Sequence, residues 1–419
     1  MIVDRNFQKT VLPNGLRVIS ETIPSVRSIS LGVWVEVGSR FEPVEFNGMS
    51  HFIEHMVFKG TKRRNAAQIA SSLEEIGGNL NAFTSREHTC YTARVLDEFL
   101  PDALDVLADL TCHATFTPSN MNKERQVIGE EIKESLDNPS DHVHDLFAKA
   151  YWGDHPLGRP ILGPKTNIDR ITRQEMVSYV RNHYRAESIV VAASGSLTHK
   201  KLVSLVKEKF SFPDGRAPQA AAPKRSHPRS VEVTTNDNSQ VHLTLAFPGL
   251  QYRSTDRIPA LLLNAYLGGG MSSVLFQKIR EDKGLAYSVY TYHDFLKDTG
   301  VFGAYVGTDK DHVVQALDIL RKETARMKKK PLTPAQLSKI KAQIKGNLTL
   351  GLESTSSRMN RIARLELMLG SFQTIPQTLR EIDRVTSKQI QELANRMFDD
   401  KQLAIAVLGP VQPSTFAHV

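Results

Sequence analysis

The chain has 419 residues, which is enough for two or three domains of ordinary size, each with its own core. Hydrophobic residues make up 40% and charged residues 23% of it, as in soluble globular proteins and unlike disordered or fibrous ones. The net charge is +8, but Lys and Arg are scattered and no aromatic-rich basic motif accompanies them. We therefore expect no nucleic-acid partner. We expect no membrane partner either, because no apolar run approaches the length of a membrane span.

The two cysteines, Cys90 and Cys112, are too few for a disulfide framework or a cysteine metal cluster. A reducing compartment is therefore expected. The first ten residues have neither the apolar core of a signal peptide nor the Arg-rich, acid-free composition of a transit peptide. These features predict a bacterial cytoplasmic protein, with the mature form of an organelle protein as the alternative.

The first half of the chain alternates between strand and helix patterns. Apolar alternation predicts a strand at 29–37, and a strand pair is expected at 79–95. Helices are predicted from 51 to the Lys59-Gly60 stop, after the Asn65 cap, at 98–112, and from Thr117-Pro118-Ser119 to about Leu136.

The first of these helices carries the sequence His-Phe-Ile-Glu-His at residues 51–55. His51 and His55 are four residues apart, so their imidazoles lie one turn apart on one face, where both can bind a single metal ion. Glu54 lies on the same side and can take a proton from a reacting water molecule. The order H-x-x-E-H is the inverted form of the zinc-protease helix. The alternative is an amphipathic helix with two solvated histidines.

A catalytic zinc ion needs a third protein ligand. The helix that begins near Ser119 is acidic, and two of its carboxylates, seven residues apart, share a face. One carboxylate of such a pair could bind the metal while the other orients a ligand. Spacing alone does not choose among the four candidates Glu124, Glu130, Glu131 and Glu134.

A Pro- and Ala-rich linker at 213–229 divides the chain into a catalytic domain at 1–212 and a second domain at 230–419. The two halves resemble distant copies of each other. Gly-Met-Ser at 48–50 recurs at 270–272 and Thr-Pro at 117–118 recurs at 333–334, each followed by a helical pattern. Strands at 241–247 and within 285–306 and a helix at 311–327 repeat the first-half order.

This order predicts an α+β fold of two homologous domains, each a mainly antiparallel sheet with helices packed on one face. The repeat alignment sets Ser273, Phe276 and Gln277 against His51, Glu54 and His55. The second copy therefore lacks the proposed metal-site residues, and only the first domain is expected to bind metal.

The chain resembles the pitrilysin/insulysin family of zinc peptidases, and most closely the bacterial relatives of the mitochondrial processing peptidase. The resemblance covers nearly the whole chain. It is carried by the segments HFIEHMVFKGT at 51–61, NAFTSREHT at 81–89, ERQVIGEEI at 124–132, LGGGMSS at 267–273 and REDKGLAYS at 280–288.

The resemblance implies a role for each matching residue of the first domain. His51 and His55 would bind one zinc ion per chain, with Glu131, 76 residues beyond the second His, as the third ligand. Glu54 would be the general base. Glu124 would match a carboxylate that supports catalysis.

The remaining matches imply contacts with substrate. Asn81, Ala82 and Phe83 would form an edge strand that pairs with the substrate backbone. Arg280 and Tyr287 would hold the substrate and stabilise the oxyanion. Since the family builds a clamshell from four such domains and this chain supplies two, the resemblance implies a homodimer in which this pair reaches the partner's zinc site.

The sequence therefore predicts a zinc-dependent endopeptidase that hydrolyses peptides or unfolded, flexible polypeptide segments. The alternative is a non-catalytic assembly subunit of the same fold. Such a subunit would typically have lost part of the motif, whereas every matching residue is present here.

Overall fold

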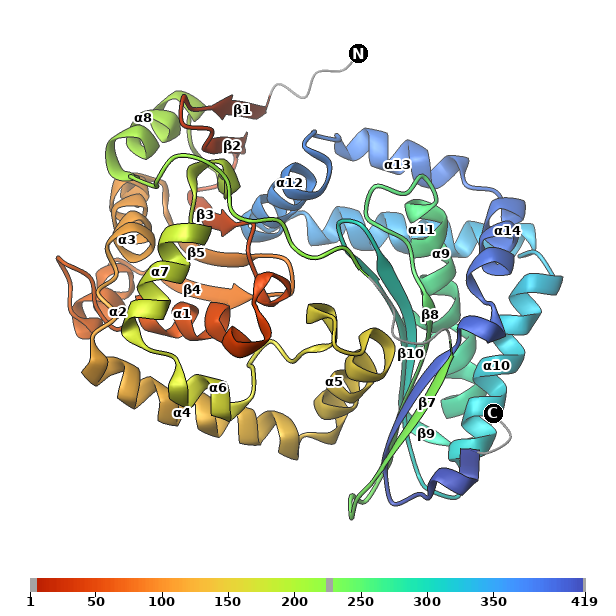
Figure 1. Cartoon of the computed structure of the whole chain (residues 1–419). Helices are drawn as coiled ribbons and strands as arrows, with labels where there is room; N and C mark the ends of the chain where they lie inside the picture. The colour runs from red at the N-terminus through yellow and green to blue at the C-terminus, as the bar shows by residue number, and fades with distance from the viewer. Residues whose placement is uncertain (1–5, 224–228, 417–419) are drawn as a thin grey trace. The chain divides into compact units, whose positions relative to one another are not determined.

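The strands and helices follow the predicted order along the chain. The computed structural model describes residues 6–223 and 229–416, which fall into two compact units (Figure 1). The first unit holds residues up to 132 together with 160–221 and 350–372. The second holds the rest, namely 133–159, 222–349 and 373 onward.

The first unit is built on a six-stranded sheet in the order β1-β2-β6-β3-β5-β4. Neighbouring strands are antiparallel except β2 and β6, so the sheet is mainly antiparallel, as predicted. Its strands are β1 (Phe7–Val11), β2 (Arg17–Thr22), β3 (Ser28–Val35), β4 (Asn79–Thr84), β5 (Thr89–Leu96) and β6 (Ile189–Gly195).

Helices cover one face of this sheet and enclose the main core. Buried side chains of β3 such as Leu31 and Val33 meet Phe52, Ile53 and Met56 of the first helix. The helices of this unit are α1 (Met49–Val57), α2 (Ala66–Glu74), α3 (Leu100–His113), α4 (Pro118–Asp137, to Ile132), α6 (Lys165–Arg170), α7 (Arg173–His183) and α8 (His199–Lys209).

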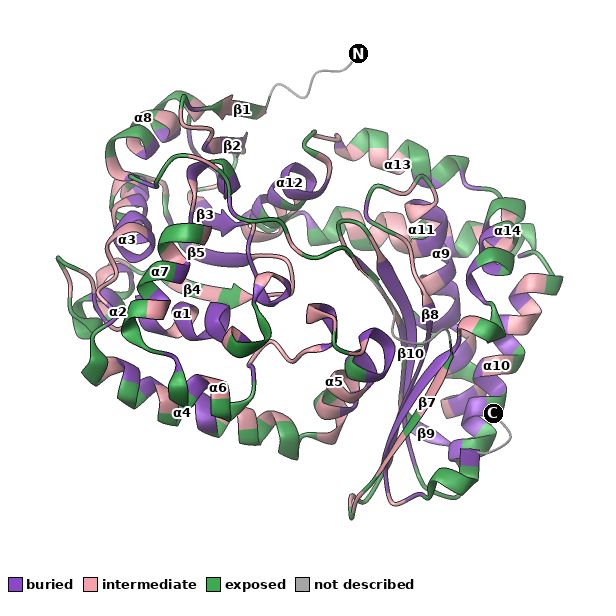
Figure 2. Cartoon of the chain, in the orientation of Figure 1, coloured by how far each residue is buried: buried purple, intermediate pink, exposed green. Residues whose placement is uncertain are grey.

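The opposite face of the first sheet is covered by a helix from the far end of the sequence. Met359 and Ile362 of α12 (Thr355–Leu369) pack against Trp34, Ile19 and Val190. The central strands of the sheet are therefore buried on both faces, and β3 is almost entirely buried (Figure 2). The expected helices on one face are present, and α12 is an addition that the sequence did not indicate.

The second unit repeats this plan with a five-stranded sheet in the order β7-β11-β8-β10-β9. Only β7 and β11 run parallel. The strands are β7 (Ser230–Thr235), β8 (Val241–Pro248), β9 (Ala286–Phe295), β10 (Gly300–Thr308) and β11 (Ala404–Gly409). The helices are α5 (Pro139–Trp152), α9 (Arg257–Gly268), α10 (Val313–Lys329), α11 (Pro334–Gly351), α13 (Ile375–Arg384) and α14 (Ser387–Met397).

The helix α5 comes from the first half of the sequence but packs on the second sheet. Its Val143 and Phe147 lie among Ala246, Ala404 and Ala406 of β8 and β11. A single cut at 213–229 therefore does not describe the packing, because α5 and α12 each bury their apolar face against the sheet of the other half. Of the expected linker, residues 213–223 contain no helix or strand, and residues 224–228 lie outside the described part.

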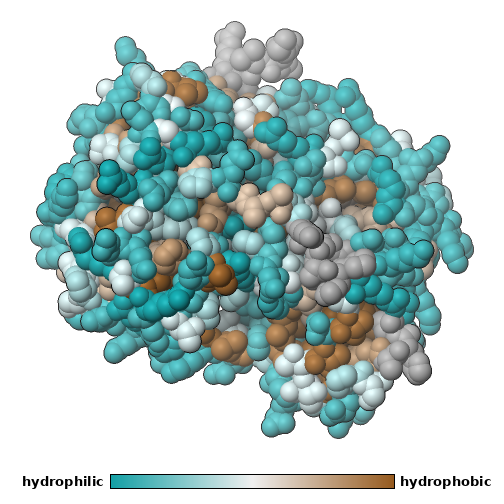
Figure 3. All heavy atoms as spheres, viewed as in Figure 1, coloured by the Kyte–Doolittle hydropathy of each residue, from teal (hydrophilic) through white to brown (hydrophobic). Residues whose placement is uncertain are grey.

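One repeated element differs between the two halves. The first Gly-Met-Ser opens α1, whereas the segment after the second is a six-residue π-helical turn, Phe276–Glu281. No helix among the described residues is both long and apolar enough to cross a membrane. The surface on the face shown is mostly hydrophilic with hydrophobic areas between (Figure 3).

Candidate metal centre

The helix α1 presents the histidine pair, and a buried carboxylate fixes where it begins. The N-cap residue is Gly48, which adopts φ 99° and has no side chain to cap the helix. Glu42 takes that role, because its carboxylate accepts hydrogen bonds from the backbone N–H groups of Gly48 at 2.8 Å and Ser50 at 2.7 Å. His51 follows directly in the first turn, so this anchor also sets its position.

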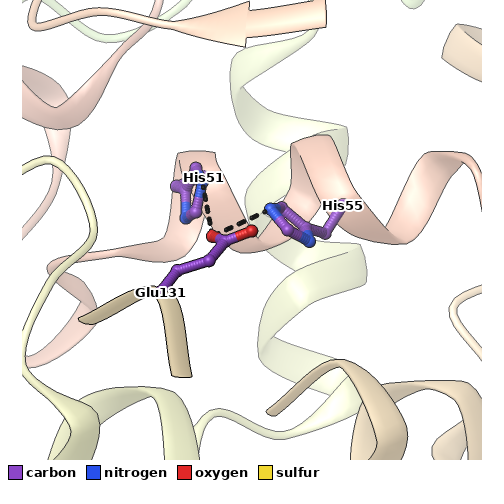
Figure 4. Close-up of side chains that lie close together, drawn as sticks. All are labelled: His51, His55 and Glu131. Atoms are coloured by element: carbon purple, nitrogen blue, oxygen red, sulfur yellow. Dashed lines mark ion pairs between the residues drawn. The ribbon is translucent and has the colours of Figure 1, made fainter. Parts of the chain in front are cut away.

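His51, His55 and Glu131 converge as predicted. Oε2 of Glu131 lies 3.6 Å from Nε2 of His51 and 3.4 Å from Nε2 of His55. Figure 4 shows the carboxylate of Glu131, from α4, reaching between the two imidazoles of α1. Among the described residues, these three form the one group of His, Cys and acidic side chains able to hold a metal ion.

The donor set fits zinc. Ligand atoms about 2.0–2.1 Å from a tetrahedral zinc ion lie about 3.3 Å from one another, close to the separations between Glu131 and the two histidines. Burial and the neighbouring His55 lower the pKa of His51 to about 4, which favours the neutral imidazole that a metal requires. Two imidazole nitrogens and one carboxylate leave a fourth position open, as in catalytic zinc sites.

Glu54 lies beside this group and is oriented by the edge of the first sheet. The hydroxyl of Thr84 at the end of β4 donates to Oε2 of Glu54 at 2.6 Å. Burial raises the pKa of Glu54, and the nearby carboxylate of Glu131 acts in the same direction. A carboxylate with a raised pKa, held in place beside a metal site, is suited to accept and return a proton.

Glu124 lies behind the histidines. One of its oxygens, Oε2, is 3.1 Å from Nδ1 of His55, and the other is 2.9 Å from Nζ of Lys59. The two-turn spacing of Glu124 and Glu131 does place both on the side of α4 that faces α1. The structure thus selects Glu131 for the metal group and Glu124 for the support of His55, while Glu130 and Glu134 belong to neither.

The segment Asn81-Ala82-Phe83 lies in β4, the outermost strand of the first sheet. Leu80 and Ala82 face the core beneath α1, on the same side as Thr84. Phe83 points to the other face, where it makes edge contact with Trp34 at 5.5 Å between ring centroids. The strand therefore has the edge position that pairing with an extended peptide needs.

Arg280 and Tyr287 belong to the second unit, where they contact each other. The guanidinium of Arg280 donates to the carbonyl oxygen of Tyr287 at 2.9 Å and lies over its ring, 4.6 Å from the centroid. The side chain of Tyr287 is 74% exposed and so is available for other contacts. Their expected role at a metal site remains a prediction.

Three residues that position the site were not identified from the sequence. Thr84 and Lys59 lie inside the segments that carry the family resemblance, but no spacing rule connects them to Glu54 or Glu124. Glu42 lies before α1. The one signal in the sequence was the Gly at the N-cap of α1, because a glycine has no side chain and another group must then accept the N–H hydrogen bonds.

Comparison with known proteins identifies the family. A family model described as Insulinase (Peptidase family M16) matches residues 17–165, and one described as Peptidase M16 inactive domain matches residues 170–344. A Bacillus subtilis protein named uncharacterized zinc protease YmxG is 40% identical over 397 residues, which cover 95% of this chain and 97% of that protein.

Two further similarities cover almost the whole chain. A probable mitochondrial-processing peptidase subunit beta of Arabidopsis thaliana is 34% identical, over 96% of this chain and 78% of that protein. The crystal structure of a protease from Helicobacter pylori superposes with a TM-score of 0.90 at 24% identity, covering 96% of this chain and 99% of that one. The chain therefore belongs to the insulinase family of peptidases, family M16.

Proposed function

We propose that this protein is a zinc-dependent endopeptidase that hydrolyses peptides or flexible polypeptide segments. The observation that carries the proposal is the convergence of His51, His55 and Glu131 beside a half-buried Glu54 that a hydrogen bond orients. The relatives named as zinc proteases, at about 40% identity over nearly the full chain, support the same activity.

Each residue of the site has a defined task in this reaction. A zinc ion held by His51, His55 and Glu131 would supply a Lewis acid at the open position. Glu54 takes a proton from the attacking water while the oxygen of that water bonds to the carbonyl carbon of the scissile peptide. The same carboxyl then gives that proton to the amide nitrogen as the C–N bond breaks.

The substrate is held in extended form along β4. Backbone pairing with Asn81, Ala82 and Phe83 would bring a carbonyl group beside Glu54, because Thr84 of the same strand already contacts that carboxylate. Strand pairing requires an extended chain, so folded proteins would be poor substrates. This geometry supports a preference for peptides and unfolded segments.

We further propose that the chain acts as a homodimer with one zinc ion per chain. In this arrangement Arg280 and Tyr287 of one chain stabilise the oxyanion at the site of the other. The contact between the two side chains supports a joint role. The bacterial relatives and the two unpaired cysteines support a place in the bacterial cytoplasm.

The decisive experiment compares the wild type with Glu54→Gln. The variant is expected to keep about one zinc ion per chain, since no metal ligand is changed, and to lose about 10²- to 10⁴-fold in turnover of a flexible peptide. Zinc is measured by atomic absorption and cleavage by mass spectrometry.

Two results would overturn the proposal. Cleavage by Glu54→Gln at the wild-type rate would exclude Glu54 as the base. Wild-type protein that binds zinc but cleaves no peptide from a diverse library would favour the non-catalytic assembly subunit.

A further inference from the structure

We propose that Lys59 is a positioning residue that holds Glu124 against His55 and thereby strengthens zinc binding. The inference rests on the proposed zinc site but concerns a residue that has no role in the chemistry described above. Lys59 lies just beyond the end of α1, four residues after His55.

The contacts form a continuous chain from Lys59 to the metal group. Nζ of Lys59 lies 2.9 Å from Oε1 of Glu124, Oε2 of Glu124 lies 3.1 Å from Nδ1 of His55, and Nε2 of His55 faces Glu131. The side chain of Glu124 is only 5% exposed. Both of its oxygens are engaged, so its orientation depends on both partners.

Charge explains why Lys59 is needed. When His55 binds a metal through Nε2, its Nδ1 carries the hydrogen and the ring is neutral. Within the described residues, Lys59 is then the one cationic partner of the Glu124 carboxylate. A buried carboxylate without a balancing cation is costly, so removing Lys59 is expected to displace Glu124 from His55.

This support is specific to one of the two histidines. Nδ1 of His51 is buried and has no hydrogen-bond partner among the described residues. The link from Lys59 through Glu124 is therefore the outer contact that fixes an imidazole of this pair. Such contacts orient the ring and raise its affinity for metal.

The test measures zinc affinity by competition with a chelator, which does not depend on activity. Lys59→Met is expected to weaken binding about tenfold, and Lys59→Arg to restore most of the loss, because it keeps the charge. Glu124→Gln is expected to weaken binding about 10- to 100-fold. Adding Lys59→Met to Glu124→Gln should cause no further loss, because Lys59 acts through Glu124.

The first unit offers a matched control. Lys9 pairs with the buried Glu366 at 2.7 Å, and the side-chain exposures of 31% and 3% resemble those of 36% and 5% for Lys59 and Glu124. Among the described residues, no histidine is paired with Glu366. Because Arg17 also lies 3.4 Å from Glu366, Lys9→Met should cost no more stability than Lys59→Met, measured as the melting temperature without zinc, and should leave zinc affinity unchanged.

The outcomes separate this inference from the proposed function. If Lys59→Met binds zinc as tightly as the wild type, the positioning role is excluded while the zinc site stands. The same conclusion follows if the losses of zinc affinity from Lys59→Met and Glu124→Gln multiply in the double variant. Equal losses of zinc affinity in Lys59→Met and Lys9→Met would show that loss of either ion pair weakens zinc binding through general stability. That result would also exclude the positioning role of Lys59. Absence of zinc binding by the wild type would remove the proposed function and this inference together.

Discussion

At the scale of single residues, the surroundings of Glu54 meet two demands that its proposed role as general base makes. The carboxylate has to be shielded from water, and burial does raise its pKa. The carboxylate also has to keep one orientation, and the Thr84 hydroxyl donates a hydrogen bond to Oε2 of Glu54 at 2.6 Å. The second oxygen is then oriented by the geometry of the carboxyl group. Activity should therefore depend on Thr84, which takes no part in proton transfer.

We predict that Thr84→Val lowers kcat about 10- to 100-fold and leaves KM and zinc content near wild type. The reason is that a carboxylate free to rotate is misplaced for attack even when its chemistry is intact. Steady-state kinetics with a fluorogenic peptide and metal analysis measure the three quantities.

Thr84→Ser is the control for this prediction, because it keeps the hydroxyl and should retain most of the activity. A valine variant with wild-type kcat would show that the hydrogen bond does not orient the base.

The sequence predicted the three candidate metal ligands and the supporting carboxylate Glu124, but not the residues that hold Glu54 and Glu124 in place. His51, Glu54 and His55 follow from spacing within one helix turn, which is a local property. Glu131 could be separated from Glu124, Glu130 and Glu134 only by family resemblance, because the distance between α1 and α4 is set by packing. Lys59, Thr84 and Glu42 became visible only when their partners were placed in space.

At the scale of elements, β9 of the second unit carries a half-buried histidine outside the candidate metal site. The ring of His293 is stacked on Phe295 with centroids 3.8 Å apart, and its Nε2 accepts a hydrogen bond from the Leu250 N–H at 2.9 Å. Burial lowers the pKa of His293 to about 4. The folded state therefore favours the neutral ring, and protonation opposes folding.

The resulting pH dependence has a definite sign. In the unfolded chain a His has a pKa of about 6.5, so between pH 6.5 and 4 the unfolded state binds more protons. The stabilising contribution is complete above pH 6.5 and is lost as the pH falls towards 4, by at most about 3 kcal/mol.

We predict that His293→Gln shows a shallower loss of stability between pH 7 and pH 4.5 than the wild type. The measurement is the urea midpoint at each pH. Parallel curves for the two proteins would show that His293 does not titrate with unfolding. Because His51 and His88 also have pKa values lowered to about 4, the difference between the curves is the informative quantity.

Most elements were predictable because local signals agree with their final environment. The Asn65 cap, the Gly-Gly stop after α2 and the long amphipathic α3 all act within a few residues. The turn at 276–281 was expected to be an ordinary helix like its counterpart α1. It forms instead a π-helical segment, which the repeat comparison had no means to indicate.

At the scale of the whole molecule, the proposed homodimer makes a specific prediction about shared sites. If Arg280 and Tyr287 act on the partner's zinc site, two inactive variants should complement each other. Mixing Glu54→Gln with Tyr287→Phe would place an intact Glu54 from one chain opposite an intact Tyr287 from the other.

We expect activity to appear in this mixture after subunit exchange, approaching a quarter of the wild-type rate for random pairing, since about half of the dimers are mixed and each has one complete site. Each variant alone should remain slow. A mixture that stays as slow as its components would place Tyr287 in the same chain as the site it serves. Size-exclusion chromatography with light scattering checks that both variants are dimers.

The sequence by itself determined the α+β class and the repeated halves, and it predicted the metal motif. These features reside in local periodicity, caps and short spacings, which act before the chain folds. Only the tertiary structure decided which helix covers which sheet, because the amphipathic patterns of α5 and α12 would be the same for packing against either sheet. It also decided which carboxylate reaches the histidines, since that depends on packing between elements some seventy residues apart.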